Sequence, residues 1–213
     1  MDPHGSQPLV RSGEPLGTAP VLLMVHGRGA GPRNILDLVP RLARPGFTHL
    51  APAAAGRTWY PFSFLAETDK NEPGLSSALH TLDAIVGQVI ASGVTPERIV
   101  LLGFSQGACL AAEFAARHAR RYGGLIVFTG GLMGPAGTPR DYPGSFDGTP
   151  VFLGCGDVDM HVPKDRVDET AAVFARMGAV VDERIYPGMA HIVNDDEIAA
   201  AQAILDGVLQ PIR

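Results

Sequence analysis

A serine flanked by two glycines lies where an apolar run meets an alanine-rich segment. In IVLLGFSQGACLAAEFAARHA, residues 99–119, Gly103 precedes Ser105 by two positions and Gly107 follows it by two. A strand that turns sharply into a helix strains its corner residue, and glycines on either side remove side chains that would collide there. The pattern predicts a nucleophile elbow that exposes the Ser105 hydroxyl at the positive end of a helix dipole. The alternative is a tight turn with an incidental serine.

A serine hydroxyl becomes a nucleophile only when a base takes its proton and an acid orients that base. Three histidines follow Ser105, namely His118, His161 and His191. His118 lies about three turns along the same predicted helix, and His161 follows the candidate carboxylates too closely to act with them. His191, in YPGMAHIV, stands on a loop after a predicted strand and is the expected base. The alternative for a loop histidine is a solvated turn residue.

Two aspartates, Asp157 and Asp159, follow the apolar run in VFLGCGDVDMHVP, and both are candidates for the acid. The D-V-D-M-H stretch could also hold a cation between its carboxylates and imidazole. No second ligand cluster supports a metal site, and serine acyl transfer needs none, so we expect neither a metal nor a cofactor. The remaining carboxylate is expected to organise the loop by accepting backbone N–H bonds.

Acyl transfer also needs hydrogen-bond donors for the developing oxyanion. One donor is the N–H of the residue after the nucleophile, Gln106, and the other comes from a loop after an early strand. The H-G-R-G turn, residues 26–29, follows the apolar run VLLMV and places Arg28 to give the second N–H. A phosphate-binding glycine loop is the rival interpretation, but the spacing matches neither G-x-x-x-x-G-K-[ST] nor G-x-G-x-x-G.

The elements that must position these residues alternate along the chain. Short β-branched or leucine-rich runs predict strands, and apolar residues at helical spacing predict helices between them. We expect strands at 21–25, 48–51, 99–104, 124–128, 151–154 and 180–186, and helices at 75–90, 106–120, 164–177 and 197–209. Such alternation is typical of an α/β protein with a mostly parallel sheet covered by helices on both faces. Residues 1–18, with PLVRSGEPL, are expected to form an edge hairpin or a partly flexible terminus, and residues 53–72 and 132–149 are left unassigned.

Composition limits the class of protein. With 213 residues, 46% of them hydrophobic, the chain can bury a full core, and we expect one domain over 1–213. A net charge of -5 offers no basic surface for nucleic acid, and the two cysteines lack metal-ligand or disulfide spacing. No run approaches the roughly 18 apolar residues of a membrane span, and the first residues lack the core of a signal peptide. We expect a soluble, cytoplasmic protein without nucleic-acid or integral membrane association, as a monomer or a homodimer.

Taken together, the motifs resemble the phospholipase/carboxylesterase family of α/β-hydrolases, which includes the acyl-protein thioesterases. HGRGA, GFSQGA, GDVDMHVP and YPGMAH occur in the family's order and cover most of the chain from Val21 onward. WYPFSF with NEPGL looks like a bacterial carboxylesterase branch. The resemblance implies an α/β-hydrolase fold without a separate lid domain. It also implies a hydrolase of carboxylic esters, with thioesterase or lysophospholipase activity left open.

The resemblance also separates the two aspartates. The family's acid lies in G-x-x-D-x-x-V-P, which maps onto the segment from Gly156 to Pro163 and favours Asp159. Met160 and His161 stand where many relatives carry a proline-containing pair, a departure that concerns the loop and not the triad. The expected mechanism is attack by Ser105, proton relay by His191 and orientation of His191 by Asp159.

The apolar cluster WYPFSFL lies in a loop that, by the resemblance, leaves the sheet near the catalytic edge. We expect Trp59 and Tyr60 to form one wall of a short, open groove for acetyl to roughly octanoyl groups or a small aromatic ester, and Leu132 and Met133 to form the facing wall. Phe62 and Phe64 are expected mainly to close the core. Two alternatives are a dienelactone-hydrolase-like enzyme, typically with a cysteine nucleophile, and a hydrolase-shaped binding or receptor protein with little turnover.

Overall fold

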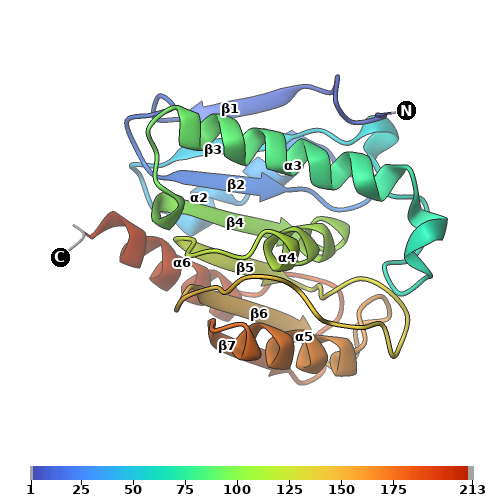
Figure 1. Cartoon of the computed structure of the whole chain (residues 1–213). Helices are drawn as coiled ribbons and strands as arrows, with labels where there is room; N and C mark the ends of the chain where they lie inside the picture. Colours follow the sequence, from blue (N-terminus) through green and yellow to red (C-terminus); the bar gives the residue numbers. More distant parts are fainter. Residues whose placement is uncertain (1, 211–213) are drawn as a thin grey trace.

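The computed structural model describes residues 2–210, in which seven strands form one sheet in the order β1-β3-β2-β4-β5-β6-β7 (Figure 1). The strands are β1 (Leu9–Gly13), β2 (Val21–Val25), β3 (Thr48–Pro52), β4 (Ile99–Phe104), β5 (Gly124–Phe128), β6 (Pro150–Gly156) and β7 (Val180–Tyr186). All neighbouring strands pair in parallel except β1 and β3, which are antiparallel. The expected mostly parallel sheet is confirmed.

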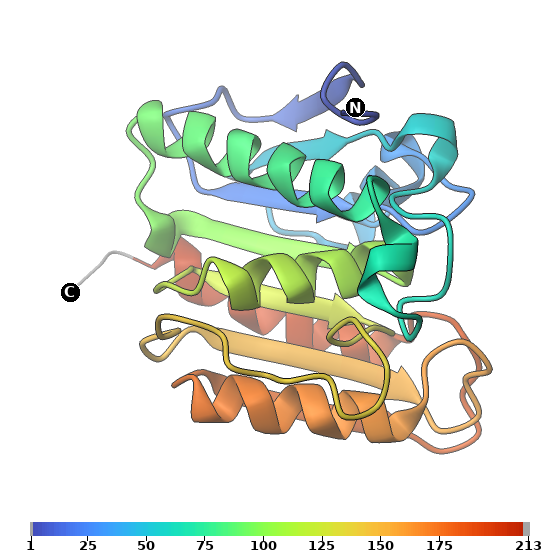
Figure 2. The same ribbon diagram turned by 45° about the vertical axis from the view of Figure 1, so that its right-hand side comes forward.

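Helices cover both faces of this sheet. The helices are α1 (Pro32–Leu36), α2 (Val39–Leu42), α3 (Gly74–Ala91), α4 (Gln106–Arg117), α5 (Lys164–Arg176) and α6 (Asp195–Leu209). Figure 2 shows α3, α4 and α5 on the near face and α6 on the far face. A hydrophobic core lies on each face of the sheet, and successive residues of β2 point into opposite cores. Val21 and Leu23 belong to the core under α3, α4 and α5, and Leu22 and Met24 to the core under α1, α2 and α6. No helix within residues 2–210 has both the length and the apolar character to cross a bilayer.

The expected strands and long helices are confirmed, with β3 and β6 extended by one to three residues. The expected edge hairpin is wrong, because residues 9–13 form a single strand that pairs with β3. Pro15 lacks an N–H for a returning strand, and Glu14 instead donates its N–H to the Phe47 carbonyl. The helices α1 and α2 were not predicted, since five and four residues are too few to show a helical period.

Loops that follow β2, β4, β6 and β7 all leave the same edge of the sheet, where the carboxyl ends of parallel strands meet. This edge is where open α/β sheets bind ligands. The unassigned residues 53–72 also lie after a strand, β3, and their only regular elements are two short 3₁₀ helices, η1 (Ala55–Arg57) and η2 (Thr68–Asn71). Residues at this edge therefore form the candidate site.

Candidate active site

Ser105 occupies a strained corner between β4 and α4. Its backbone has φ 55° and ψ -121°, a conformation that side-chain-bearing residues rarely adopt. The flanking glycines are required by close packing: a Cβ on Gly107 would lie 2.1 Å from the Val25 carbonyl oxygen, and one on Gly103 would lie 2.3 Å from the Gly107 carbonyl oxygen. The elbow geometry expected from G-F-S-Q-G is thus present, and it holds Ser105 at the N-cap of α4.

The structure brings Ser105, His191 and Asp159 into one hydrogen-bonded chain. The Ser105 Oγ lies 2.7 Å from Nε2 of His191, and Nδ1 of His191 lies 2.7 Å from Oδ2 of Asp159. A carboxylate can only accept, so Nδ1 of His191 carries the proton and donates it. This tautomer leaves Nε2 free to accept the Ser105 proton, as a general base must.

Asp159 is held ionised by its surroundings. Its side chain is fully buried, and its Oδ1 accepts from the N–H groups of His161 at 2.8 Å and Val162 at 3.1 Å. Burial acts to raise the pKa of Asp159, but the hydrogen bonds from His191 and from these two amides outweigh it and lower the pKa below its usual value. Asp159 therefore presents a carboxylate to His191.

Asp157 has a different partner. It is exposed and accepts a hydrogen bond of 2.7 Å from the N–H of Gly188, in the loop that carries His191. This matches the loop-organising role expected for the second carboxylate. Among residues 2–210, no three His, Cys, Asp or Glu side chains converge in a metal-ligand arrangement.

Two aromatic neighbours of His191 were not predicted as site residues. The ring of Phe104 lies 5.3 Å from the His191 ring, and the exposed ring of His161 lies 4.8 Å from it, edge on. Phe104 is the residue before the nucleophile in the elbow, a position that could have identified it. His161 could have been identified only from the position of Asp159, since its N–H binds that carboxylate.

The candidate oxyanion donors lie in two separate loops. No acceptor within residues 2–210 is bonded to the backbone N–H of Arg28 or of Gln106. The turn that carries Arg28 is fixed by the buried side chain of His26. Its Nδ1 lies 2.8 Å from the Gly27 carbonyl oxygen, and its Nε2 accepts a hydrogen bond of 3.1 Å from the Ala54 N–H. Burial lowers the pKa of His26, which keeps its ring neutral for these two opposite roles.

A cavity of about 500 Å³ opens beside Ser105. Its lining comes from the oxyanion turn, the elbow, the irregular segment after β3 and the loop after β6: Gly27, Arg28, Ala30, Tyr60, Pro61, Phe62, Ser63, Phe64, Phe104, Ser105, Gln106, Cys109, His161, Val162 and His191. Tyr60 lies in this lining, as expected of a wall residue. Phe62 does too, with 56% of its surface exposed, so the expectation that it closes the core does not hold.

Trp59, Leu132 and Met133 lie outside the cavity lining, and we do not retain them as contact residues. Trp59 is fully buried behind the wall, where its Nε1 donates to the His26 carbonyl at 2.9 Å. A buried indole needs such a partner, and the core supplies one. Leu132 is also buried, and its backbone is bonded to α5: its N–H donates to Thr170 Oγ1 and its carbonyl accepts from Arg166 Nη1.

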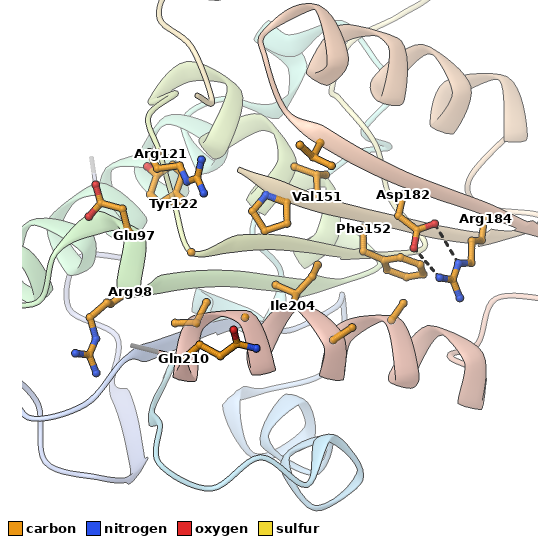
Figure 3. Close-up of a pocket in the computed structure, with 17 residues that line it drawn as sticks. Glu97, Arg98, Arg121, Tyr122, Val151, Phe152, Asp182, Arg184, Ile204 and Gln210 are labelled. Carbon is orange, nitrogen blue, oxygen red and sulfur yellow. Dashed lines mark hydrogen bonds and ion pairs between the residues drawn. The ribbon is translucent and has the colours of Figure 1, made fainter. Parts of the chain in front are cut away.

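A larger cavity of about 840 Å³ lies at the opposite edge of the sheet, where the strands begin (Figure 3). It is bounded by α6 and β7, with Ile204 on one side and the ion pair of Asp182 with Arg184 on the other. Its lining contains neither Ser, Cys nor His. Size alone would select this cavity, but the hydrogen-bonded pair of Ser105 and His191 identifies the smaller one as the candidate site.

Comparison with known proteins agrees with this geometry. The model of the phospholipase/carboxylesterase family matches residues 15–209. The chain belongs to this family. The family consists of hydrolases, and a crystal structure of the phospholipase/carboxylesterase from Dyadobacter fermentans is 40% identical, covering 96% of this chain and 97% of that one with a TM-score of 0.90. The α/β-hydrolase fold is thereby confirmed.

More distant relatives carry the names acyl-protein thioesterase and carboxylesterase. Acyl-protein thioesterase 1 of Saccharomyces cerevisiae is 30% identical over 143 residues, which are 66% of this chain and 61% of the yeast protein. A probable carboxylesterase of Arabidopsis thaliana, SOBER1-like, is 25% identical over 145 residues, which are 68% of this chain and 55% of the plant protein. The chain thus covers less than two thirds of the length of these relatives.

Proposed function

We propose that this protein is a serine hydrolase that cleaves carboxylic esters, and thioesters as related substrates, through an acyl-serine intermediate. The single observation that carries the proposal is the continuous chain from Ser105 through His191 to Asp159, with 2.7 Å at each link. Its position beside an apolar cavity at the carboxyl edge of the sheet supports the same function.

Each residue has a defined step in this mechanism. Ser105 Oγ attacks the ester carbonyl carbon while Nε2 of His191 takes the hydroxyl proton. The N–H groups of Arg28 and Gln106 stabilise the negative oxygen of the tetrahedral intermediate. Collapse expels the alcohol or thiol, which receives the proton from Nε2 of His191. Water then attacks the acyl-serine with His191 again as base, and Asp159 stabilises the imidazolium in both halves.

The cavity supports substrates of limited size. At about 500 Å³ it falls in the lower half of the range for small-molecule sites. Its apolar side chains, among them Phe62, Phe64 and Val162, suit a short to medium acyl chain or a small aromatic group. Each further buried CH₂ contributes about 0.8 kcal/mol only while wall remains to cover it. We therefore propose esters from acetyl to roughly octanoyl.

Neither alternative is favoured by the site. A dienelactone-hydrolase-like enzyme would need a cysteine nucleophile, and Cys109, which also lines the cavity, is a poor one because burial raises its pKa to about 12. A binding protein would not need the aligned tautomer and strained elbow at Ser105. Cys109 and Cys155 are both free and buried, which fits the cytoplasmic location that we propose.

Labelling with a fluorophosphonate tests the proposal, followed by p-nitrophenyl esters from two to sixteen carbons and matched thioesters. We expect covalent labelling of the wild type, none of Ser105→Ala, and a kcat/KM that stops rising by about eight to twelve carbons. Ser105→Ala should retain the fold and lose at least about 10⁴-fold in kcat. A variant that keeps near-wild-type hydrolysis would show that Ser105 is not the nucleophile.

A further inference from the structure

The wall of the cavity is a segment without regular structure. Residues 59–62 make no backbone–backbone hydrogen bond to any residue between 2 and 210. Their position relative to Ser105 therefore depends on side chains from other parts of the chain. Two residues, Arg28 and Gln106, supply most of these bonds, and both are the residues whose backbone N–H groups we propose as oxyanion donors.

The guanidinium of Arg28 donates hydrogen bonds to Thr58 and to three carbonyls of this segment. Nη1 donates to Thr58 Oγ1 and to the Pro61 carbonyl, each at 2.9 Å, and Nη2 donates to the carbonyls of Tyr60 at 2.9 Å and Phe62 at 2.7 Å. No carboxylate within residues 2–210 forms an ion pair with Arg28. The guanidinium of Arg28 thus contacts only neutral groups of one segment, namely these oxygens and the Tyr60 ring, whose centroid lies 5.9 Å from Cζ.

The side-chain amide of Gln106 forms hydrogen bonds with the same segment. Its Oε1 accepts from the Trp59 N–H at 2.9 Å, and its Nε2 donates to the Tyr60 carbonyl at 2.8 Å. Gln106 is buried in the first turn of α4, directly after Ser105. The wall is therefore fixed to the elbow as well as to the oxyanion turn.

We propose that the guanidinium of Arg28 is a positioning group that locks residues 58–62 onto the oxyanion turn, so that the wall and the Arg28 N–H keep one fixed geometry relative to Ser105. The proposal rests on the proposed esterase function. A planar fork with several donors can bind three carbonyls at once, whereas the ammonium of a lysine cannot span them. Displacing a substrate by about 1 Å can cost about 10²-fold in rate.

The test compares Arg28→Ala and Arg28→Lys with Arg33→Ala, an exposed arginine of α1 outside the cavity lining. We expect both Arg28 variants to lose at least about tenfold in kcat/KM on butyryl and octanoyl esters and to lose discrimination between them. Methylguanidinium at millimolar concentration should restore part of the loss in Arg28→Ala, because the Arg28 side chain is exposed and its site open, but not in Arg28→Lys. Arg33→Ala should match the wild type.

A second measurement does not depend on activity. Trp59 is the only tryptophan of the chain, is fully buried, and lies within the locked segment. We expect acrylamide to quench its fluorescence at least about twofold more strongly in Arg28→Ala, and methylguanidinium to reverse this. Circular dichroism verifies the fold, and if Arg28→Ala unfolds, Arg28→Lys carries both measurements.

The outcomes separate the two proposals. Wild-type kinetics and Trp59 quenching in both Arg28 variants would overturn the lock while leaving the esterase intact. Failure of the wild type to be labelled by a fluorophosphonate would overturn the esterase, and the Trp59 measurement would still decide the lock.

Discussion

Replacing Asp159 by asparagine, with Asp157→Asn as its matched control, tests which of the two carboxylates is catalytic, a role that we propose for Asp159. Both changes exchange a carboxylate for an amide of the same shape, two positions apart in one loop. The fully buried Asp159 accepts from Nδ1 of His191 and from two backbone N–H groups. The exposed Asp157 accepts one hydrogen bond, from Gly188.

The hydrogen bonds of the two carboxylates determine how much activity each variant is expected to lose. In Asp159→Asn the amide oxygen continues to accept from the N–H groups of His161 and Val162, so its NH₂ faces Nδ1 of His191. His191 must then protonate on Nε2 and can no longer accept the Ser105 proton. A wrong tautomer of this kind costs about 10⁴-fold in kcat, or about 5.5 kcal/mol. The amide oxygen of Asp157→Asn still accepts from Gly188, so we expect a loss of less than about threefold.

The assay is kcat and KM on p-nitrophenyl butyrate together with urea unfolding of each variant. The loss in Asp159→Asn should fall on kcat, and it should exceed any loss of folded protein. Equal effects at the two positions, or a larger one at Asp157, would refute the assignment of the acid. A rate loss explained by unfolding alone would do the same.

Two further predictions concern stability. Burial raises the pKa of Glu197 to about 7 from 4.5. The free energy of unfolding is therefore highest below pH 4.5 and falls as the pH rises, because Glu197 ionises in the unfolded chain before it does so in the folded one. Above about pH 7 it levels off, after a loss of about 3 kcal/mol. Urea unfolding from pH 4.5 to 8 should show this slope in the wild type and lack it in Glu197→Gln; parallel curves would contradict the prediction. Gly107→Ala should destabilise the fold by about 2–3 kcal/mol, because the added Cβ meets the Val25 carbonyl. Gly87→Ala in α3 should be neutral or stabilising, because there the added Cβ meets no described atom within 4 Å outside its own helix turn.

Strand positions and the proximity of Ser105, His191 and Asp159 could be predicted from the sequence because each depends on a local pattern. Buried parallel strands give uninterrupted apolar runs, and the ends of β2 and β4 coincide with the ends of those runs. Parallel strands bring their carboxyl ends to one edge, so residues that follow them are expected to meet there. The choice between Asp157 and Asp159 required the family resemblance, since both follow the same strand.

The wall could not be predicted because its segment has no period. In a strand or helix, spacing tells which side chains face inward, but between β3 and α3 no such rule applies. The type of side chain alone favours Trp59 for the cavity and Phe62 for the core. In the structure Trp59 is buried in the core and Phe62 lines the cavity. The residues that decide this arrangement, Arg28 and Gln106, lie 30 to 48 positions away from the segment. No local pattern links residues at that separation.

The manner in which the wall is held has a consequence for specificity. Three of the four bonds from Arg28 go to backbone carbonyls, which every residue type possesses. A different side chain at Phe62 would change the surface that meets the substrate and leave its carbonyl bonded to Arg28. Substitutions at Arg28 or Gln106, in contrast, would release the carbonyls and disturb the proposed oxyanion donors together. By the proposed lock, the wall can therefore vary in chemistry while its position relative to Ser105, the proposed nucleophile, stays constant.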